Sequence, residues 1–333
     1  MKDLSIIIPT YNSCSKLLKL IESVTKQNLK YDYEIVIIDD GSKDNTAVEC
    51  RKIMKNNKKI IYKYQENSGV SKARNVGIEI SCGNFIMFAD ADDYYCNDTL
   101  NEVIGKMDGY DLIITGYNRI NIENGKSISK RINMREYNLN EYDILIEKLQ
   151  ENNLFNQIWN KIYKRDIIKN NNLFFDEKIE YGEDYQFNIK YLFCTKKILV
   201  LSNVIYNYFN EINGLNNTYR RNRFDLNRNN LFLLEEYFKK NNLNIEYINK
   251  KYFITLISGI NNICKNDNSK ERKNDLLKLC YDNQTYMYLK RNKSLKAKIL
   301  MNLLKTKNTF LLELLGKIVK IYERKYKKRK LGY

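Results

Sequence analysis

Short apolar runs recur over the first 115 residues of the chain. They are rich in Ile, Val and Phe, as buried parallel strands are, and lie at residues 5–8, 34–38, 59–64, 85–89 and 111–115. Their length of four to six residues is too short for helices. Each run is therefore predicted to be a strand with both faces covered.

Between these runs, apolar residues return at helical spacing, as at Leu17, Leu20, Ile21 and Val24. Helices are predicted to begin after a cap at Asn12 or Ser13, at Thr46 and at Ser71. Strands and helices that alternate at these lengths form βαβ units. The first third of the chain thus predicts an α/β fold with a mostly parallel, Rossmann-like sheet.

The pattern changes in the rest of the chain. Residues 142–149 and the segment after Gly182 are predicted to be helical, residues 198–205 to form a strand, and the chain after about residue 225 to be helical throughout. We therefore expect a first domain over residues 1–225, with halves at 1–110 and 111–225. A helical C-terminal region is expected over residues 226–333.

The net charge of +17 is concentrated at the C-terminus. Residues 290–333 hold 15 Lys and Arg against Glu313 and Glu323, which leaves the remainder of the chain close to neutral. A protein that wraps nucleic acid over its surface would spread this charge over its body, so we expect no nucleic acid partner.

The residues 290–333 are also amphipathic. An apolar stripe flanked by Lys and Arg is formed by Leu311, Leu314, Leu315, Ile318 and Val319. This pattern is typical of a helix lying on an anionic membrane. The alternative is a helix packed on the rest of the protein, with its basic end in solvent. A homo-oligomer formed through the C-terminal helices is a further expectation.

Two residue types limit the chemistry and the compartment. His is absent, so Ser-His and Cys-His hydrolases are excluded, and a general base must be a carboxylate, thiolate, Lys, Tyr or water. Seven Cys without a C-x-x-C pair indicate reduced thiols. The sequence has no signal peptide pattern and no run of about 18 apolar residues. We therefore expect a cytoplasmic protein, peripheral on the inner face of the membrane.

Acidic residues follow two of the predicted strands. Asp39 and Asp40 end the second strand, and Asp90, Asp92 and Asp93 follow the fourth. Ligands of open parallel sheets bind at the carboxyl ends of the strands, and a D-x-D pair offers hard oxygen ligands to Mg²⁺ or Mn²⁺, which can bridge a diphosphate. The alternative is that one aspartate caps the next helix and the others are solvated.

Five motifs in register resemble the family 2 glycosyltransferases of bacterial cell-surface polysaccharide synthesis, which have the GT-A fold. In chain order these are IIIPTYN, VIIDDGSKDNT, ENSGVSKARNVGI, FADADD and GED-x-x-F, the last at residues 182–187. The resemblance implies that residues 1–110 bind the nucleotide and residues 111–225 the acceptor.

The resemblance also implies a nucleotide-binding role for the residues of the first three motifs. Pro9 and Tyr11 would lie under the nucleobase, and Asp40 would accept the N3–H of uracil. Its neighbour Asp39 is expected to cap a helix or to hydrogen-bond the backbone instead. Asn67 would lie near the ribose and Arg74 near the diphosphate. For Tyr11 and Arg74, the alternatives are an ordinary surface tyrosine and a solvated helix residue.

The D-A-D motif, by the same resemblance, contacts the nucleotide sugar through Asp90, Ala91 and Asp92. Asp90 would take the ribose side and Asp92 the metal, with Asp90 as the second candidate metal ligand. Asp93 is either a contributor to the sugar and acceptor site or a supporting residue. Because there is no His, diphosphate oxygens and water would complete the shell of a Mn²⁺ or Mg²⁺ ion.

The catalytic residues implied by the resemblance lie in the fifth motif. Asp184 would be the general base and Glu183 would orient it or the acceptor; the alternative is an ordinary acidic helix N-terminus. Trp159 and Lys161 match a recurrent feature between the D-x-D motif and the base. Trp159 would then be a platform for a sugar ring, with core packing as the alternative.

The implied function is inverting, metal-dependent transfer of a hexose or N-acetylhexosamine from a UDP-sugar to a hydroxyl of a growing glycan, free or lipid-linked. A catalytically inactive glycan-binding or scaffold protein at the membrane is the alternative. Sugar nucleotidyltransferases and dinucleotide dehydrogenases are disfavoured, because the first strand is followed by no Gly-rich loop. The motifs specify neither the sugar nor the acceptor.

Overall fold

The computed structural model describes residues 2–179, 181–210 and 219–319 and divides the chain into two compact units, Met1–Ile212 and Asn213–Tyr333. The expected boundary at residue 225 is wrong, because it falls inside helix α8 (Arg223–Lys240), which packs on α9 (Glu246–Ile263) of the second unit.

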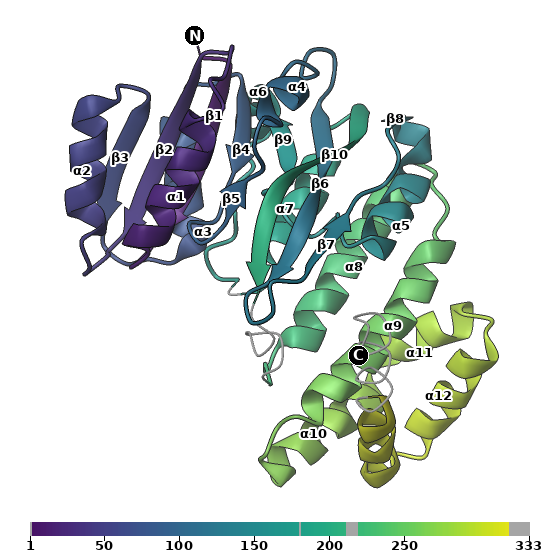
Figure 1. Ribbon diagram of the computed structural model, residues 1–333. Helices are drawn as coiled ribbons and strands as arrows, with labels where there is room; N and C mark the ends of the chain where they lie inside the picture. The colour runs from purple at the N-terminus through teal and green to yellow at the C-terminus, as the bar shows by residue number, and fades with distance from the viewer. Residues whose placement is uncertain (1, 180, 211–218, 320–333) are drawn as a thin grey trace. The chain divides into compact units, whose positions relative to one another are not determined.

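The first unit is built on one ten-stranded sheet in the order β3-β2-β1-β4-β9-β6-β10-β5, with β7 paired to β6 and β8 to β10 (Figure 1). Its strands are β1 (Leu4–Thr10), β2 (Tyr33–Asp40), β3 (Ile60–Gln65), β4 (Phe85–Phe88), β5 (Tyr94–Tyr95), β6 (Leu112–Asn121), β7 (Ser127–Lys130), β8 (Arg135–Asn138), β9 (Lys161–Lys164) and β10 (Lys197–Asn210).

The predicted parallel arrangement is confirmed in the first four strands, β3, β2, β1 and β4. Beyond them the sheet is mixed, because β9 lies antiparallel between β4 and β6, whereas β6 and β10 are parallel. Every residue of β1 and β2 is buried, as expected for apolar runs covered on both faces. The α/β fold class is thus as predicted.

The helices of the first unit follow its strands. They are α1 (Cys14–Thr25), α2 (Thr46–Asn56), α3 (Val70–Ile80), α4 (Leu100–Ile104), α5 (Tyr142–Glu151), α6 (Arg165–Asn170) and α7 (Glu183–Leu192), with a 3₁₀ turn at Leu139–Glu141. Helix α3 packs on β1 and β2. A Cβ atom at Gly77 would lie 2.3 Å from the side chain of Ile7, so the glycine is needed for this close packing.

The strand order reverses at β1, which has β2 on one side and β4 on the other. The carboxyl ends of β1, β2 and β4 meet at this point, where open α/β sheets bind their ligands. Pro9 is tolerated in this central strand because β4 pairs with β1 only as far as Ile7. The missing N–H of Pro9 would point toward β4, beyond its last paired residue.

The expected side-chain cap of α1 is not made. Ser13 occupies the cap position without a side-chain bond to the helix, and its hydroxyl donates to the carbonyl oxygen of Tyr11. The Oδ1 atom of Asn12 instead accepts from the backbone N–H of Lys43, at 2.7 Å. These polar side chains therefore tie the loop after β1 to the loop after β2.

The second unit is helical, as predicted. Its helices are α8, α9, α10 (Ser269–Tyr281), α11 (Asn283–Arg291) and α12 (Leu295–Lys305), followed by helical residues 309–319. Tyr252 of α9 and Tyr288 of α11 stack with ring centroids 4.0 Å apart, and the Tyr252 hydroxyl bonds that of Thr285. Stacked aromatic rings thus form part of the core of this unit.

Residues 290–333 do not behave as one solvated tail in the part that the structure describes. Ala297, Leu300, Leu304 and Leu312 are buried within the helical unit, whereas Phe310 is 71% exposed. The expected stripe is therefore divided: Leu314 and Ile318 are exposed, and Leu315 and Val319 are half-buried. None of the helices described in the structure is long and apolar enough to cross a membrane.

Candidate active site

Two aspartates at the end of β2 accept hydrogen bonds that fix the loops after β2 and β3. The carboxylate of Asp39 accepts the backbone N–H of Ser42 and the hydroxyl of Tyr62, which agrees with its expected backbone role. Asp40 accepts from the backbone N–H groups of Ser68 and Gly69, each at 2.8 Å, and from the Gln65 side chain at 2.7 Å. Asp40 is buried, and its hydrogen bonds fix the conformation of the loop after β3. This structural role was not expected from the sequence.

The exposed residues at this edge lie on the loops after β1 and β3. Tyr11, which follows β1, is 46% exposed, and Pro9 is buried beneath it in the strand. Asn67 is exposed, and a Cβ atom at Gly41 would lie 2.8 Å from its backbone nitrogen. The loops after β2 and β3 therefore touch, and Tyr11 has a ring face able to stack on a planar ligand.

Arg74 of α3 lies at the centre of an ionic cluster. Its Nη1 atom donates to Asp184 at 2.9 Å and to Glu183 at 3.1 Å, and its Nη2 atom donates to Asp90 at 3.1 Å. We call Arg74, Asp90, Glu183 and Asp184 the carboxylate–arginine cluster. The structure thus brings the expected base together with an aspartate of the D-A-D motif, although the two are far apart in sequence.

The cluster shifts the ionisation of its members. Burial would lower the pKa of Arg74, but Asp184, Asp90 and Glu183 outweigh it and raise the pKa above its ordinary value. Burial raises the pKa of Asp184 to about 7; Arg74 opposes this rise and Glu183 adds to it. A carboxylate with a pKa near neutrality is suited to accept a proton in catalysis.

Arg74 had been expected to face the diphosphate of a donor. In the structure Arg74 is only 4% exposed, and its guanidinium is bonded to carboxylates instead. The physical reason is the local excess of negative charge, because three carboxylates converge on this one cation. Phe175, which the sequence analysis did not identify, lies 5.3 Å below the guanidinium.

Residues 90–93, which follow β4 after Ala89, are divided between the surface and the interior. Asp92 is exposed, the side chain of Asp90 is one-third exposed, and Ala91 is buried between them. Asp93 points inward, where its Oδ1 atom accepts the backbone N–H of Phe209 on β10. Burial, with a smaller contribution from Asp90, raises the pKa of Asp93 to about 9. Asp93 therefore fits the supporting role, one of the two alternatives that the sequence left open, because its carboxylate is buried and bonded to β10.

The D-A-D aspartates fit a hard divalent cation. Asp90 and Asp92 present carboxylate oxygens toward solvent at the point where the strand order reverses. In the part of the chain that the structure describes, no three Cys, Asp or Glu side chains form a group that could hold a metal ion by themselves. A metal bound there would need further ligands from a nucleotide and water.

Trp159 belongs to the core, which is the alternative that the sequence left open. It is 3% exposed and stacks on Tyr206 and Tyr208, with centroids 4.6 Å and 5.4 Å away, and meets Tyr117 edge-on. It is therefore not a platform for a sugar ring in this structure. Tyr206, for which the sequence gave no role, also accepts the backbone N–H of Asp90 at 2.9 Å.

Lys161 is also buried and does not face a ligand. Its ammonium group donates to the carbonyl oxygens of Leu154 and Gln157 and to the side chain of Asn160. Burial lowers the pKa of Lys161 well below its ordinary value. The expected acceptor-binding role of Lys161 is wrong, because its ammonium group is needed to hold the segment before β9.

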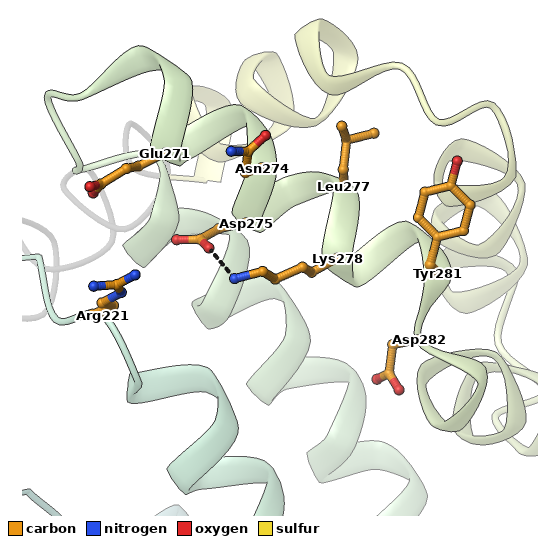
Figure 2. A pocket seen from close by; sticks show the side chains of 8 residues that line it. All are labelled: Arg221, Glu271, Asn274, Asp275, Leu277, Lys278, Tyr281 and Asp282. Atoms are coloured by element: carbon orange, nitrogen blue, oxygen red, sulfur yellow. Dashed lines mark hydrogen bonds and ion pairs between the residues drawn. The ribbon is translucent and has the colours of Figure 1, made fainter.

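A separate cavity of about 540 Å³ lies in the helical unit (Figure 2). It is lined by Arg221, Glu271, Asn274, Asp275, Leu277, Lys278, Tyr281 and Asp282. Three of its charged groups serve the fold: Asp275 pairs with Lys278, and Asp282 caps α11. This cavity therefore does not compete with the cluster at Arg74 as the candidate active site.

Comparison with known proteins shows which family the chain belongs to. Residues 5–171 match the family described as Glycosyl transferase family 2. Over 218 residues, 64% of this chain, the sequence is 29% identical to the poly(ribitol-phosphate) beta-N-acetylglucosaminyltransferase TarS of Staphylococcus aureus (strain MW2). It is 32% identical over 221 residues, again 64% of the chain, to the enzyme of the same description, TarP, of S. aureus (strain N315).

A solved structure shares the fold. The crystal structure of residues 1–349 of S. aureus TarS in complex with UDP-GlcNAc superposes with a TM-score of 0.68 at 19% identity, covering 96% of this chain and 91% of that one. At this identity the likeness establishes the fold. The sequence match covers 36% of full-length TarS and 64% of TarP.

Proposed function

The chain belongs to glycosyl transferase family 2 and has the GT-A fold, and from this premise we propose that it transfers a hexose or N-acetylhexosamine from a UDP-sugar to a hydroxyl of a cell-surface glycan. The observation that carries the proposal is the carboxylate–arginine cluster. It joins Asp184, a carboxylate with a raised pKa, to Asp90 of the D-A-D motif through Arg74.

The relatives favour one donor and one class of acceptor. TarS and TarP are described as N-acetylglucosaminyltransferases acting on poly(ribitol-phosphate), and UDP-GlcNAc is bound in the TarS structure. UDP-GlcNAc is accordingly the first donor to test, and a polyol-phosphate or other envelope glycan the first acceptor. The exposed ring of Tyr11 at the end of β1 supports nucleobase binding at the strand ends.

The proposed reaction is a single displacement with inversion. The carboxylate of Asp184 takes the proton of the acceptor hydroxyl as its oxygen attacks the anomeric carbon. The bond between this carbon and the diphosphate oxygen breaks, its electron pair stays with UDP, and UDP leaves. Glu183, next to Asp184 at the start of α7, would orient the base through their shared partner Arg74.

Replacement of the base tests the proposal. Asp184→Asn keeps the side-chain shape but removes the proton acceptor, so transfer should fall by about 10²–10⁴-fold while UDP binding is retained. Released UDP is measured with a panel of UDP-sugars and acceptors, and UDP affinity by calorimetry. Asp108→Asn is the matched control, because Asp108 is an exposed aspartate elsewhere in the same unit.

Each outcome of this test is informative. Wild-type turnover in Asp184→Asn would remove Asp184 as the base. UDP binding without turnover of any donor in the wild-type protein would instead support the inactive, glycan-binding alternative.

Metal dependence is part of the proposal. Asp92 and Asp90 would hold Mn²⁺ or Mg²⁺, which neutralises diphosphate charge when bound. We expect EDTA to abolish transfer and added Mn²⁺ or Mg²⁺ to restore it, as measured by UDP release in metal-depleted buffer. Unchanged turnover in EDTA would contradict the assignment of these aspartates.

We also propose that the helical unit docks on the anionic inner face of the membrane. The exposed apolar side chains Phe310, Leu311, Leu314 and Ile318 lie on residues 309–319, where they recur at intervals of three and four. Fifteen Lys and Arg lie from residue 290 onward. An apolar stripe with basic flanks is suited to an interface of anionic lipids.

A further inference from the structure

We infer that Arg74 is a positioning residue that couples the donor side of the site to the base, by holding Asp90 and Asp184 with different nitrogens of one guanidinium. This inference rests on the proposed function. It assigns Arg74 a role different from binding the diphosphate, and the two roles predict different kinetics.

The contacts of Arg74 span two parts of the site. Its Nη2 atom bonds Asp90, which follows β4, and its Nη1 atom bonds Glu183 and Asp184 at the start of α7. A guanidinium is planar and presents its donors in a fixed fork. A change in the position of Asp90 therefore acts directly on the nitrogens that hold the base.

The guanidinium is itself fixed by its surroundings. Phe175 lies below it, and the ring of Phe175 stacks on Phe187 of α7, with centroids 4.3 Å apart and an interplanar angle of 5°. The neighbouring Asn75 bonds both the N–H and the carbonyl oxygen of Phe175, at 2.8 Å and 3.0 Å. Helix α3, the segment at Phe175 and helix α7 thus form one packed support for the cluster.

Of the cations around Asp184, Arg74 interacts most strongly with its carboxylate. The carboxylate of Asp184 is faced by Arg74 from α3, Glu183 from its own helix, Asp90 from the end of β4, and Lys161 and Tyr163 from β9. The Lys161 ammonium is bonded to backbone carbonyls and to Asn160. Arg74, in contrast, bonds Asp184 directly.

Coupling follows from this shared charge. Arg74 bonds both Asp90 and Asp184. When a donor or metal binds Asp90, the bond between Arg74 and Asp90 weakens, and the positive charge of the guanidinium then stabilises the Asp184 carboxylate more strongly. The ionised form of Asp184 would then be favoured over the protonated form when the donor is bound. A positioning role of this kind affects kcat and its pH dependence, whereas a diphosphate contact affects donor binding.

The test compares Arg74→Gln and Arg74→Lys with the wild-type protein. We measure kcat and the donor KM from pH 5.5 to 9.5, and UDP affinity by calorimetry. For Arg74→Gln we expect kcat at pH 7 to fall at least about tenfold and the acid limb of kcat to move up by about one pH unit, because the base loses its counter-ion. UDP affinity and donor KM should change by less than about threefold, and Arg74→Lys should restore part of kcat.

The opposite pattern would overturn the inference. A tenfold or greater loss of UDP affinity with an unmoved acid limb would show that Arg74 binds the diphosphate instead. Unchanged kinetics would show that Arg74 has no part in the mechanism. If the wild-type protein transfers no sugar at all, the proposed function fails instead, so the two failures are distinguishable.

Two further variants complete the test, one as a control and one as a substitute for the Arg74 variants. Lys72→Gln removes a positive charge from the same helix, where Lys72 pairs with Glu177 on the surface, and should leave the profile unchanged. If the Arg74 variants do not fold, as thermal melting would show, Glu183→Gln serves in their place. It removes the competing carboxylate on Nη1, so the acid limb should move to lower pH; an unmoved limb would contradict the cluster.

Discussion

At the scale of single residues, the environment of each carboxylate sets its role. Asp40 accepts backbone N–H groups of the loop after β3 and so fixes the shape of that loop. Asp184 is surrounded by two other carboxylates, and its burial raises its pKa to about 7. Asp93 is so deeply buried that its pKa rises to about 9. One side-chain type thus serves loop geometry at Asp40, strand support at Asp93 and, in the proposed mechanism, proton transfer at Asp184.

The raised pKa of Asp184 predicts the pH dependence of the reaction. The base acts only when ionised, so kcat/KM should be low at pH 5.5 and rise as the pH passes through about 7. The measurement is a pH–rate profile with UDP-GlcNAc, with UDP affinity determined over the same range as a control. A rate that stays constant from pH 5 to pH 8 would contradict a base with this pKa.

At the scale of elements, the close packing of helix α3 on the sheet sets the position of Arg74 in the candidate site. Gly77 faces Ile7 of β1 without room for a Cβ atom, and the same helix places Arg74 at the ends of the strands. The loop after β2 also lies close to the loop after β3, since a Cβ atom at Gly41 would lie 2.8 Å from the backbone nitrogen of Asn67. Small residues at these contacts therefore determine how the helix and loops meet the sheet.

A single methyl group should disturb this packing. In Gly77→Ala the added Cβ would lie 2.3 Å from the Ile7 side chain, and overpacking of this kind costs about 1–3 kcal/mol. We expect a lower free energy of unfolding in urea, together with reduced transfer because Arg74 moves with its helix. Glu79→Ala, an exposed position of α3, is the control and should change stability by less than about 0.5 kcal/mol. Equal stability of the two variants would contradict the packing argument.

At the scale of the whole molecule, the excess of positive charge and the candidate active site lie in different parts of the chain. The candidate site lies in the unit Met1–Ile212, while residues 290–333 hold 15 Lys and Arg. In these residues, buried positions such as Leu300 and Leu312 belong to the core of the helical unit. Truncation near residue 290 would therefore remove core side chains, and point substitutions are the better test of membrane docking.

The double variant Leu314→Ser/Ile318→Ser removes half of the exposed stripe and should weaken flotation with anionic liposomes several-fold. Ile254→Ser is the matched control, because Ile254 of α9 is also exposed but lies outside residues 309–319. Binding should also fall as salt rises from 0.1 M to about 0.5 M, since the basic flanks act through screened charge. Equal flotation of the double variant and the wild-type protein would argue that another surface binds lipid.

Local pattern by itself determined the parallel strands and helices of the first 100 residues, because apolar periodicity reflects which faces are buried, and it placed the acidic residues at strand ends. The family resemblance at Gly182–Phe187 made Asp184 the candidate base, an assignment that stays a prediction. Only the tertiary structure decided that Trp159, Lys161 and Asp93 face the interior and that Arg74 joins Asp90 to Asp184. The direction in which a polar side chain points depends on neighbours far away in sequence, and such contacts leave no periodic signal in the chain.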